Sequence, residues 1–261
     1  MSRVFGHFGE LLQGRVGPSG PVALVTLPCN ALWAEAQMVP ARHLSLYQPA
    51  RVVALPVLHR MLRLLGLPLV GQFRLTLNMP AGGGAGASTA ALIALAQAAG
   101  ANDAQALVQV VLAQERASDP LLFDRPEQVL WASRRGEVLA DLPPLPRFAV
   151  LGGFYGPGQR TNPDDHDFPD ISDLLQDWPG AGLPRMAQLA SESARRTLAL
   201  RGPADDPTLA LAQRLGALGF TIAHTGAARG LIFAPGTVPE TAVADLRSAG
   251  FSRITRFTCG G

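Results

Sequence analysis

Hydrophobic and polar residues alternate over residues 73–78, which read FRLTLN. This period of two is typical of a β-strand with one buried face. Pro80 ends the alternation and a run of small residues follows. An alanine- and leucine-rich stretch then continues to Gly100, a residue type that commonly ends helices. The pattern predicts a strand, a glycine-rich loop and a helix. Such a loop directs backbone N–H groups and the positive end of the helix dipole toward an anion, most commonly a phosphate.

The pattern along the rest of the chain predicts a β-rich start and an α+β second half. In the first half we expect two strands (22–27 and 31–36) and two helices (56–67 and about 103–117). In the second half we expect strands at 148–154, 220–224, 231–234 and 251–258, and helices at 184–201, 207–218 and 240–249. This order favours an antiparallel sheet with helices, an α+β fold. The proline-rich residues 143–146 predict a boundary between two domains, 1–145 and 146–261.

The composition excludes several classes of protein. Apolar residues make up 48% of the 261 positions, enough for a sizeable core, and the net charge of +2 includes no basic run that would suit nucleic acid. No apolar stretch is long enough to span a membrane, and the first ten residues lack the apolar core of a signal peptide. We therefore expect a cytoplasmic protein, monomer or homodimer, without a nucleic-acid or membrane partner. Cys29 and Cys259 are too few and too distant in sequence for a disulfide framework or a zinc site.

The glycine-rich loop does not fit the two commonest phosphate-binding motifs. A Walker A loop requires a lysine, and this chain contains no lysine at all: its 22 basic residues are all arginines. The dinucleotide fingerprint G-x-G-x-x-G fits poorly, because Gly82, Gly84 and Gly86 alternate and Ala87 stands where the third glycine would fall. The alternative is a glycine-rich turn that only allows a helix to pack closely on a sheet.

Two carboxylates follow the loop and suit metal binding or the handling of a hydroxyl group. Glu115 comes three residues after Leu112 and four after Val111, which predicts that it lies on the apolar face of its helix. Asp119 precedes Pro120, which disfavours helix at that position, so we expect Asp119 just past the helix end. Mg²⁺ is commonly held by one or two carboxylates together with substrate phosphates. The alternative is that a nearby arginine, at position 116 or 125, neutralises either acid.

Two further glycine-containing segments are candidates for the substrate side. Residues 6–14, GHFGELLQG, place three glycines around Glu10 and Gln13, which indicates either a substrate-binding loop or a plain hairpin turn. His7 alone points to a structural role. Residues 223–233, AHTGAARGLIF, contain a turn between two apolar strands, which is either an ordinary hairpin or a second backbone loop that closes over the phosphates or the substrate.

Together these segments resemble the three motifs of the GHMP kinases. Residues 80–90, PAGGGAGASTA, resemble the family pattern P-x-x-x-G-L-G-S-S-A, with Pro80, Gly84, Gly86 and Ser88 matching. Within that superfamily the chain looks most like the L-threonine kinases of cobalamin synthesis, of the propanediol-utilisation type. GELLQG resembles their C-G-E-x-x-Q-G, ERASDPLLF their E-P-T-D-S-x-x-F, and AHTGAARGLIF their A-H-S-G-T-x-x-G-L-x-F.

The resemblance implies a fold and a reaction. The implied fold is an N-terminal, nucleotide-binding domain like ribosomal protein S5, followed by a ferredoxin-like domain. The implied reaction is the ATP-dependent, Mg²⁺-assisted phosphorylation of a small alcohol, with L-threonine as the first candidate. Asp119 takes the catalytic position, as base or as orienter of the hydroxyl, while Ser88 and Glu115 take the metal positions. The residues implied to bind ATP are Pro80, Gly82, Gly83, Gly84, Gly86, Ala87, Ser88 and Thr89. Those implied to line the acceptor site are Glu10, Gln13, His224, Thr225 and Gly226.

Two departures from the family pattern leave alternatives open. Ala87 lacks a hydroxyl that many members have, and one more residue separates Glu115 from Asp119 than in E-P-T-D. The chain is therefore also compatible with a kinase for another acceptor, such as homoserine or an isoprenoid alcohol. A third alternative is a non-catalytic nucleotide-binding regulator.

Overall fold

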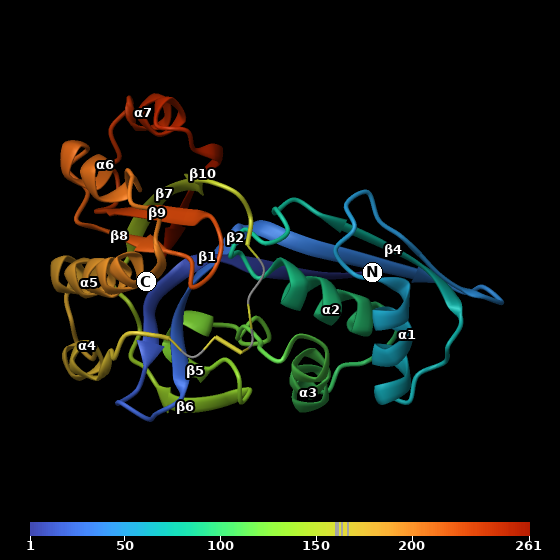
Figure 1. The fold of residues 1–261 in the computed structure, drawn as a ribbon. Coiled ribbons are helices and arrows are strands. Elements are labelled where there is room, and N and C mark those ends of the chain that lie inside the picture. Colours follow the sequence, from blue (N-terminus) through green and yellow to red (C-terminus); the bar gives the residue numbers. More distant parts are fainter. Residues whose placement is uncertain (160–161, 163, 166) are drawn as a thin grey trace.

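The computed structural model describes the whole chain except residues 160–161, 163 and 166, and it has the predicted α+β architecture (Figure 1). The eight strands on the main path of one sheet run in the order β10-β7-β9-β8-β1-β2-β4-β3, and a β5–β6 hairpin pairs with β2. The strands are β1 Ser2–Arg15, β2 Val22–Val39, β3 Leu44–Tyr47, β4 Gly71–Leu77, β5 Val129–Ala132, β6 Glu137–Asp141, β7 Phe148–Phe154, β8 Gly219–Ile222, β9 Ala228–Phe233 and β10 Ser252–Cys259. The helices are α1 Leu55–Leu64, α2 Ala87–Ala98, α3 Ala104–Glu115, α4 Ser172–Asp177, α5 Leu183–Arg201, α6 Thr208–Arg214 and α7 Ala242–Ser248, with a 3₁₀ turn at Pro126–Gln128. In the described part of the chain, no helix combines the length and the apolar character that crossing a bilayer requires.

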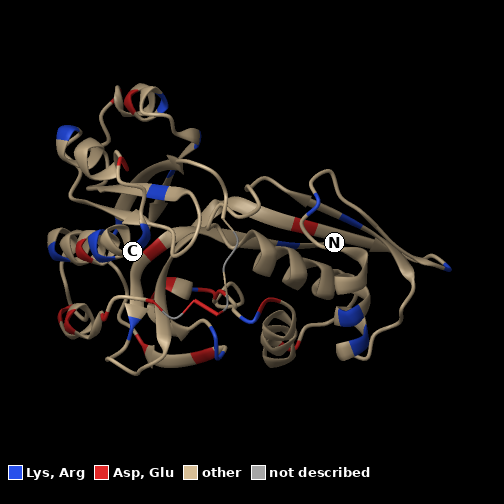
Figure 2. Ribbon diagram, in the orientation of Figure 1, with Lys and Arg blue, Asp and Glu red and all other residues tan. Residues whose placement is uncertain are grey.

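Helix α2 is the central element of the N-terminal half. It packs on β1, β2 and β4, and it carries no charged residue, so its ribbon is tan throughout in Figure 2. Nine of its residues are buried. A helix that is apolar on every side must be surrounded by protein. The strand, loop and helix predicted from the alternation over residues 73–78 are thus present, as β4, residues 78–86 and α2.

The C-terminal half has the βαββαβ order of a ferredoxin-like fold. The order along the chain is β7-α5-β8-β9-α7-β10, with α4 added before α5 and α6 before β8, and every strand pairing within this half is antiparallel. The predicted strand at 148–154 coincides with β7. The sheet continues from this half into the first through the β1–β8 pairing, and the domain boundary at residue 145 stays a prediction.

Strand β1 differs from its prediction. The segment 6–14, expected as a loop or a hairpin turn, is the irregular middle of β1, between β2 and β8. Register shifts interrupt its pairing with β2 at Gly6, at His7 and at Glu10, and Gly9 has a left-handed φ of 80°. Glycines mark bulges here rather than a turn. The two strands expected at 22–27 and 31–36 are likewise one continuous strand, β2.

A buried ion pair supports the turn between β8 and β9. The Arg229 Nε donates to Asp206 Oδ2 at 2.8 Å, and the two side chains are 7% and 4% exposed. A second guanidinium nitrogen of Arg229 donates to the Gly226 carbonyl at 3.0 Å. Asp206 also accepts a hydrogen bond from the backbone N–H of Thr208, at the start of α6. The pair therefore links α6 to the turn that contains Gly226.

Removing one partner of this pair should destabilise the fold strongly. We expect Asp206→Ala to lower the free energy of unfolding by about 3–5 kcal/mol, because it leaves the Arg229 guanidinium buried without a counter-charge. Urea unfolding followed by circular dichroism measures this change. The matched control is Asp205→Ala, at an exposed neighbouring position, where a change within about 0.5 kcal/mol is expected. Equal effects of the two substitutions would contradict the assignment.

Candidate active site

The glycine-rich loop connects β4 to the N-terminus of α2. Gly82, Gly84 and Gly86 have φ of 72°, 72° and 71°, in the left-handed region that favours glycine. The first hydrogen bond of α2 runs from the Ala90 N–H to the Gly86 carbonyl, at 2.8 Å. The N–H groups just ahead of it have no partner within the helix. No acidic side chain lies in the first turn, so this helix end suits an anion.

The turn between β8 and β9 packs directly on this loop. The N–H groups of Ala227 and Ala228 donate to the Gly83 carbonyl at 3.0 and 2.8 Å. A Cβ at Gly84 would come within 2.2 Å of the Thr225 carbonyl, and one at Gly226 within 2.5 Å of the Gly84 nitrogen. The C-terminal motif is therefore a hairpin turn that packs on the glycine-rich loop, and its closure over phosphates or a substrate stays a prediction.

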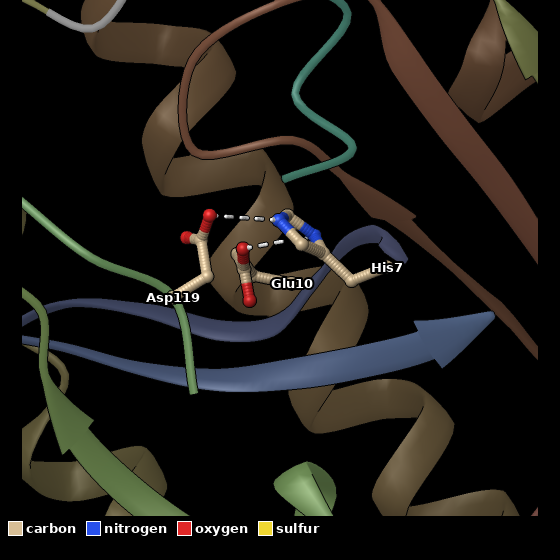
Figure 3. Close-up of side chains that lie close together, drawn as sticks. All are labelled: His7, Glu10 and Asp119. Carbon is tan, nitrogen blue, oxygen red and sulfur yellow. Dashed lines mark ion pairs between the residues drawn. The ribbon is translucent and has the colours of Figure 1, made fainter. Parts of the chain in front are cut away.

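His7, Glu10 and Asp119 meet beside the loop, and the dashed lines in Figure 3 join the imidazole to each of the two carboxylates. The His7 Nδ1 lies 3.4 Å from Glu10 Oε1, and its Nε2 lies 3.6 Å from Asp119 Oδ2. Asp119 follows the end of α3 as predicted, after Arg116 closes the helix with a left-handed φ of 58°. Its side chain is 22% exposed, against 4% for His7 and 1% for Glu10. Asp119 is thus the member of the group that a substrate can reach.

Burial and mutual attraction set the charges of this group. Burial lowers the pKa of the His7 ring, but Glu10, Asp119 and the Gly9 carbonyl together raise it to about 9. Burial raises the pKa of the Glu10 carboxyl to about 8, with Asp119 adding to the rise and His7 opposing it. Burial also raises the pKa of Asp119, but His7 and a hydrogen bond from the Thr89 side chain together outweigh it, and the pKa of Asp119 falls below its usual value. The raised pKa of His7 and the lowered pKa of Asp119 favour an imidazolium paired with an ionised Asp119 near neutral pH.

The geometry of the group favours this imidazolium over a bound metal. One atom from each of the three residues lies within 4.8 Å of the others, a spacing that could hold a metal ion. Each ring nitrogen, however, faces a carboxylate oxygen. Both nitrogens are hydrogen-bond donors only in protonated histidine, which cannot ligate a metal.

The predicted placement of Glu115 is wrong. The buried face of α3 consists of Leu107, Val110 and Val111, whereas Glu115 is exposed at the last helical position. The alternative in which Arg116 neutralises one of the two acids is also wrong, because the Arg116 guanidinium pairs with Asp164 at 2.6 Å. Ser88 is half-buried in the first turn of α2. The magnesium roles of Ser88 and Glu115 stay predictions.

A cavity of about 640 Å³ next to this group is lined in part by three of the other acceptor-side candidates. His224, Thr225 and Gly226 line it, together with Arg201. The His224 ring stacks on Phe168, with centroids 4.4 Å apart and an interplanar angle of 5°. Burial, Arg201 and Arg134 lower the pKa of His224 to about 3, so this ring is neutral.

Gln13 does not line this cavity and lies instead where β1 contacts the C-terminal half. Its side-chain nitrogen donates to the Ile222 carbonyl at 3.1 Å, and its backbone N–H donates to the Ser193 hydroxyl at 2.9 Å. These bonds give Gln13 a structural role. Its contact with a substrate stays a prediction.

His7 is the site residue that sequence reasoning missed. A single histidine in GHFGE carries little information, since its partner Asp119 lies more than a hundred positions later. The available signal was the absence of lysine, which leaves any phosphate-handling site to use arginine or histidine as its cation.

Comparisons with known proteins show the fold. No family model and no curated protein matches the sequence. The mevalonate kinase of L. major, solved with R-mevalonate, matches 99% of this chain and 96% of its own, with a TM-score of 0.66 and 13% identity. The mevalonate kinase of methicillin-resistant Staphylococcus aureus matches 100% and 98% of the two chains, with a TM-score of 0.62 and 14% identity. The homoserine kinase of Cytophaga hutchinsonii matches 99% and 94%, with a TM-score of 0.53 and 14% identity.

These structural neighbours are GHMP kinases, and their likeness covers almost the entire chain. At such identities the likeness shows the fold alone. The predicted fold class, α+β with the arrangement of a GHMP kinase, is confirmed.

The charge of His7 should depend on Asp119. We expect Asp119→Asn to lower the pKa of His7, because the substitution removes one of the two carboxylates that raise it. A ¹H–¹⁵N NMR titration of the imidazoles measures the shift, with the exposed His43 as a reference ring. Asp124→Asn, at an exposed position nearby, is the matched control. An unchanged His7 pKa in Asp119→Asn would mean that the two groups do not interact.

Proposed function

We propose that this protein is an ATP-dependent kinase that phosphorylates the hydroxyl group of a small molecule. One observation carries the proposal: the ionised, partly exposed Asp119 lies beside a glycine loop at the N-terminus of α2, with His7 against both. Phosphoryl transfer depends mostly on positioning and on neutralising charge, and these elements serve both needs.

The residues of the loop fit a triphosphate. The three left-handed glycines free the backbone to curve around an anion, and an added Cβ at Gly84 or Gly86 would collide with neighbouring groups. The Ser88 and Thr89 side chains provide hydroxyl groups in the first turn of α2, where Ala87 has none. Mg²⁺, when bound with the nucleotide, would neutralise phosphate charge, and we assign Ser88 and Glu115 to hold it. The proposed phosphate-binding set remains Pro80, Gly82, Gly83, Gly84, Gly86, Ala87, Ser88 and Thr89.

Asp119 is proposed to accept a hydrogen bond from the acceptor hydroxyl. The lowered pKa keeps Asp119 ionised and makes it a weak base. It therefore suits orienting the hydroxyl and receiving its proton late, as the bond to phosphorus forms. Glu10, His224, Thr225 and Gly226 would line the acceptor side.

L-Threonine is the acceptor we propose, with O-phospho-L-threonine for cobalamin synthesis as the product. The sequence motifs support this subfamily. The cavity beside His224 supports a polar acceptor, because Arg201 and Asp165 line it. An isoprenoid alcohol would require a more apolar lining, while homoserine remains the second candidate. Arg201 also pairs with Asp165 at 2.5 Å, so an acceptor carboxylate would have to compete with that pair.

Asp119→Asn tests the reaction directly. With ATP, Mg²⁺ and L-threonine, we expect the substitution to lower kcat at least about 10²-fold, the low end for loss of a general base. A coupled assay of ADP release measures the rate. Asp124→Asn is the matched control and should keep the rate of the unsubstituted protein. Full activity in Asp119→Asn would remove this residue from the mechanism.

The same assay separates the alternatives when L-threonine, L-homoserine and mevalonate are offered in turn. Faster turnover of another acceptor would replace threonine while keeping the kinase. Calorimetry that shows tight ATP binding, with no turnover on any acceptor, would support a nucleotide-binding regulator instead.

Glu115→Gln tests the metal assignment. If Glu115 holds Mg²⁺, we expect this variant to require at least several-fold more Mg²⁺ for half-maximal rate. It loses the Glu115 carboxylate, one of the two side-chain ligands assigned to the ion, and keeps only the Ser88 hydroxyl. Glu137→Gln, at an exposed position of β6, is the control. An unchanged Mg²⁺ requirement would remove Glu115 from the site.

A further inference from the structure

His7 touches the phosphate loop as well as Asp119. Its backbone N–H donates to the Ala85 carbonyl at 3.2 Å. A Cβ at Gly86 would come within 2.7 Å of the imidazole Cδ2 and 3.1 Å of its Nε2. The ring therefore lies against the residue that precedes α2, and only glycine leaves it this room.

His7 is also the cation of Asp119. Among the described residues, it is the only side chain that forms an ion pair with Asp119. The chain has no lysine to take this place, and Arg116, three positions before Asp119, pairs with Asp164.

The titratable groups around the ring and around Asp119 come from three parts of the fold. Glu10 faces Nδ1 from β1 itself, and Asp119 faces Nε2 from the segment after α3. His224, from the turn between β8 and β9, faces Asp119 and is neutral. Glu10 Oε2 is buried and has no hydrogen-bond partner among the described residues. The bulged middle of β1 thus presents one cation at the junction of loop and carboxylate.

We propose that His7 is a positioning residue for phosphoryl transfer: its positive charge holds Asp119 in place and ties that carboxylate to the phosphate loop. This inference rests on the proposed kinase function. His7 acts through Asp119, so its loss leaves the phosphate-binding backbone in place and misplaces the group that handles the acceptor hydroxyl.

The first test compares His7→Gln with His7→Lys. We expect His7→Gln to lower kcat about 10²-fold, the size of effect that a small misplacement produces, with the KM for ATP changed less than about 3-fold. His7→Lys restores the positive charge and should recover most of the lost rate. His59→Gln, on the exposed side of α1, is the matched control.

The pH dependence gives a readout that a purely structural role would not move. The rate of the unsubstituted protein should fall as pH rises through about 9, where the His7 ring loses its proton. In His7→Lys this fall should move to higher pH, since the ordinary pKa of lysine is about 10.4. A fall at the same pH in both proteins would overturn the proposal.

A double-mutant cycle tests whether His7 acts through Asp119. If it does, His7→Gln should have almost no further effect on kcat in the Asp119→Asn background. If the two residues act independently, the fold-reductions in kcat of the two substitutions multiply. Multiplied effects would overturn the proposal. Calorimetric ATP binding by each variant shows that it is folded. If His7→Gln does not fold, the pH profile and rate of His7→Lys still decide the question.

The two levels of inference fail differently. If the unsubstituted protein phosphorylates no acceptor, the kinase proposal fails. If it is active and His7→Gln is equally active, only the role of His7 fails.

Discussion

The structure depends on the direct contact between two backbone turns from opposite halves of the chain. The Gly83 carbonyl accepts two hydrogen bonds from the turn after β8, and no side chain fits between Gly84 and Gly226. This contact fixes the phosphate loop against the C-terminal half. The turn supplies Thr225 and Gly226 to the lining of the cavity, and the loop supplies the Ala85 carbonyl and Gly86 that contact His7, so both parts of the site adjoin one close approach.

Two ion pairs, one buried and one partly exposed at Asp119, support that contact from different directions. The pair of Arg229 and Asp206 holds the Gly226 carbonyl from the C-terminal half. The pair of His7 and Asp119 lies against Gly86 from the N-terminal half. A charge removed from water is tolerated only when it is paired. Substitution within either pair therefore affects the contact between the glycine-rich loop and the turn after β8. The pair of Arg229 and Asp206 has this effect although it contains no group proposed to meet a substrate.

The features that could be predicted from the sequence are those in which neighbouring residues carry the information. The alternation in β4, the glycines of the loop and the proline after Asp119 each act within a few positions, and their local structures are confirmed. Glu115 was misplaced because two helical stripes of α3 are apolar and only tertiary packing selects the one with Val110. His7 was missed because the residues that set its charge lie on another element. Strand β1 was read as a loop because it is buried on both faces, which removes the alternation that marks a half-buried strand.

The central position of β1 has a consequence for how the molecule forms. This strand precedes β2 and β8 along the chain yet lies between them in the sheet, and the side chain of Gln13 bonds to a carbonyl 209 positions later. During synthesis one edge of β1 stays without its partner until most of the chain has emerged. Contacts so distant in sequence form slowly, and open strand edges invite pairing with other chains. An N-terminal fragment would therefore carry His7, Asp119 and the glycine loop on a sheet with an open edge, as a surface prone to aggregation and without the turn that completes the site.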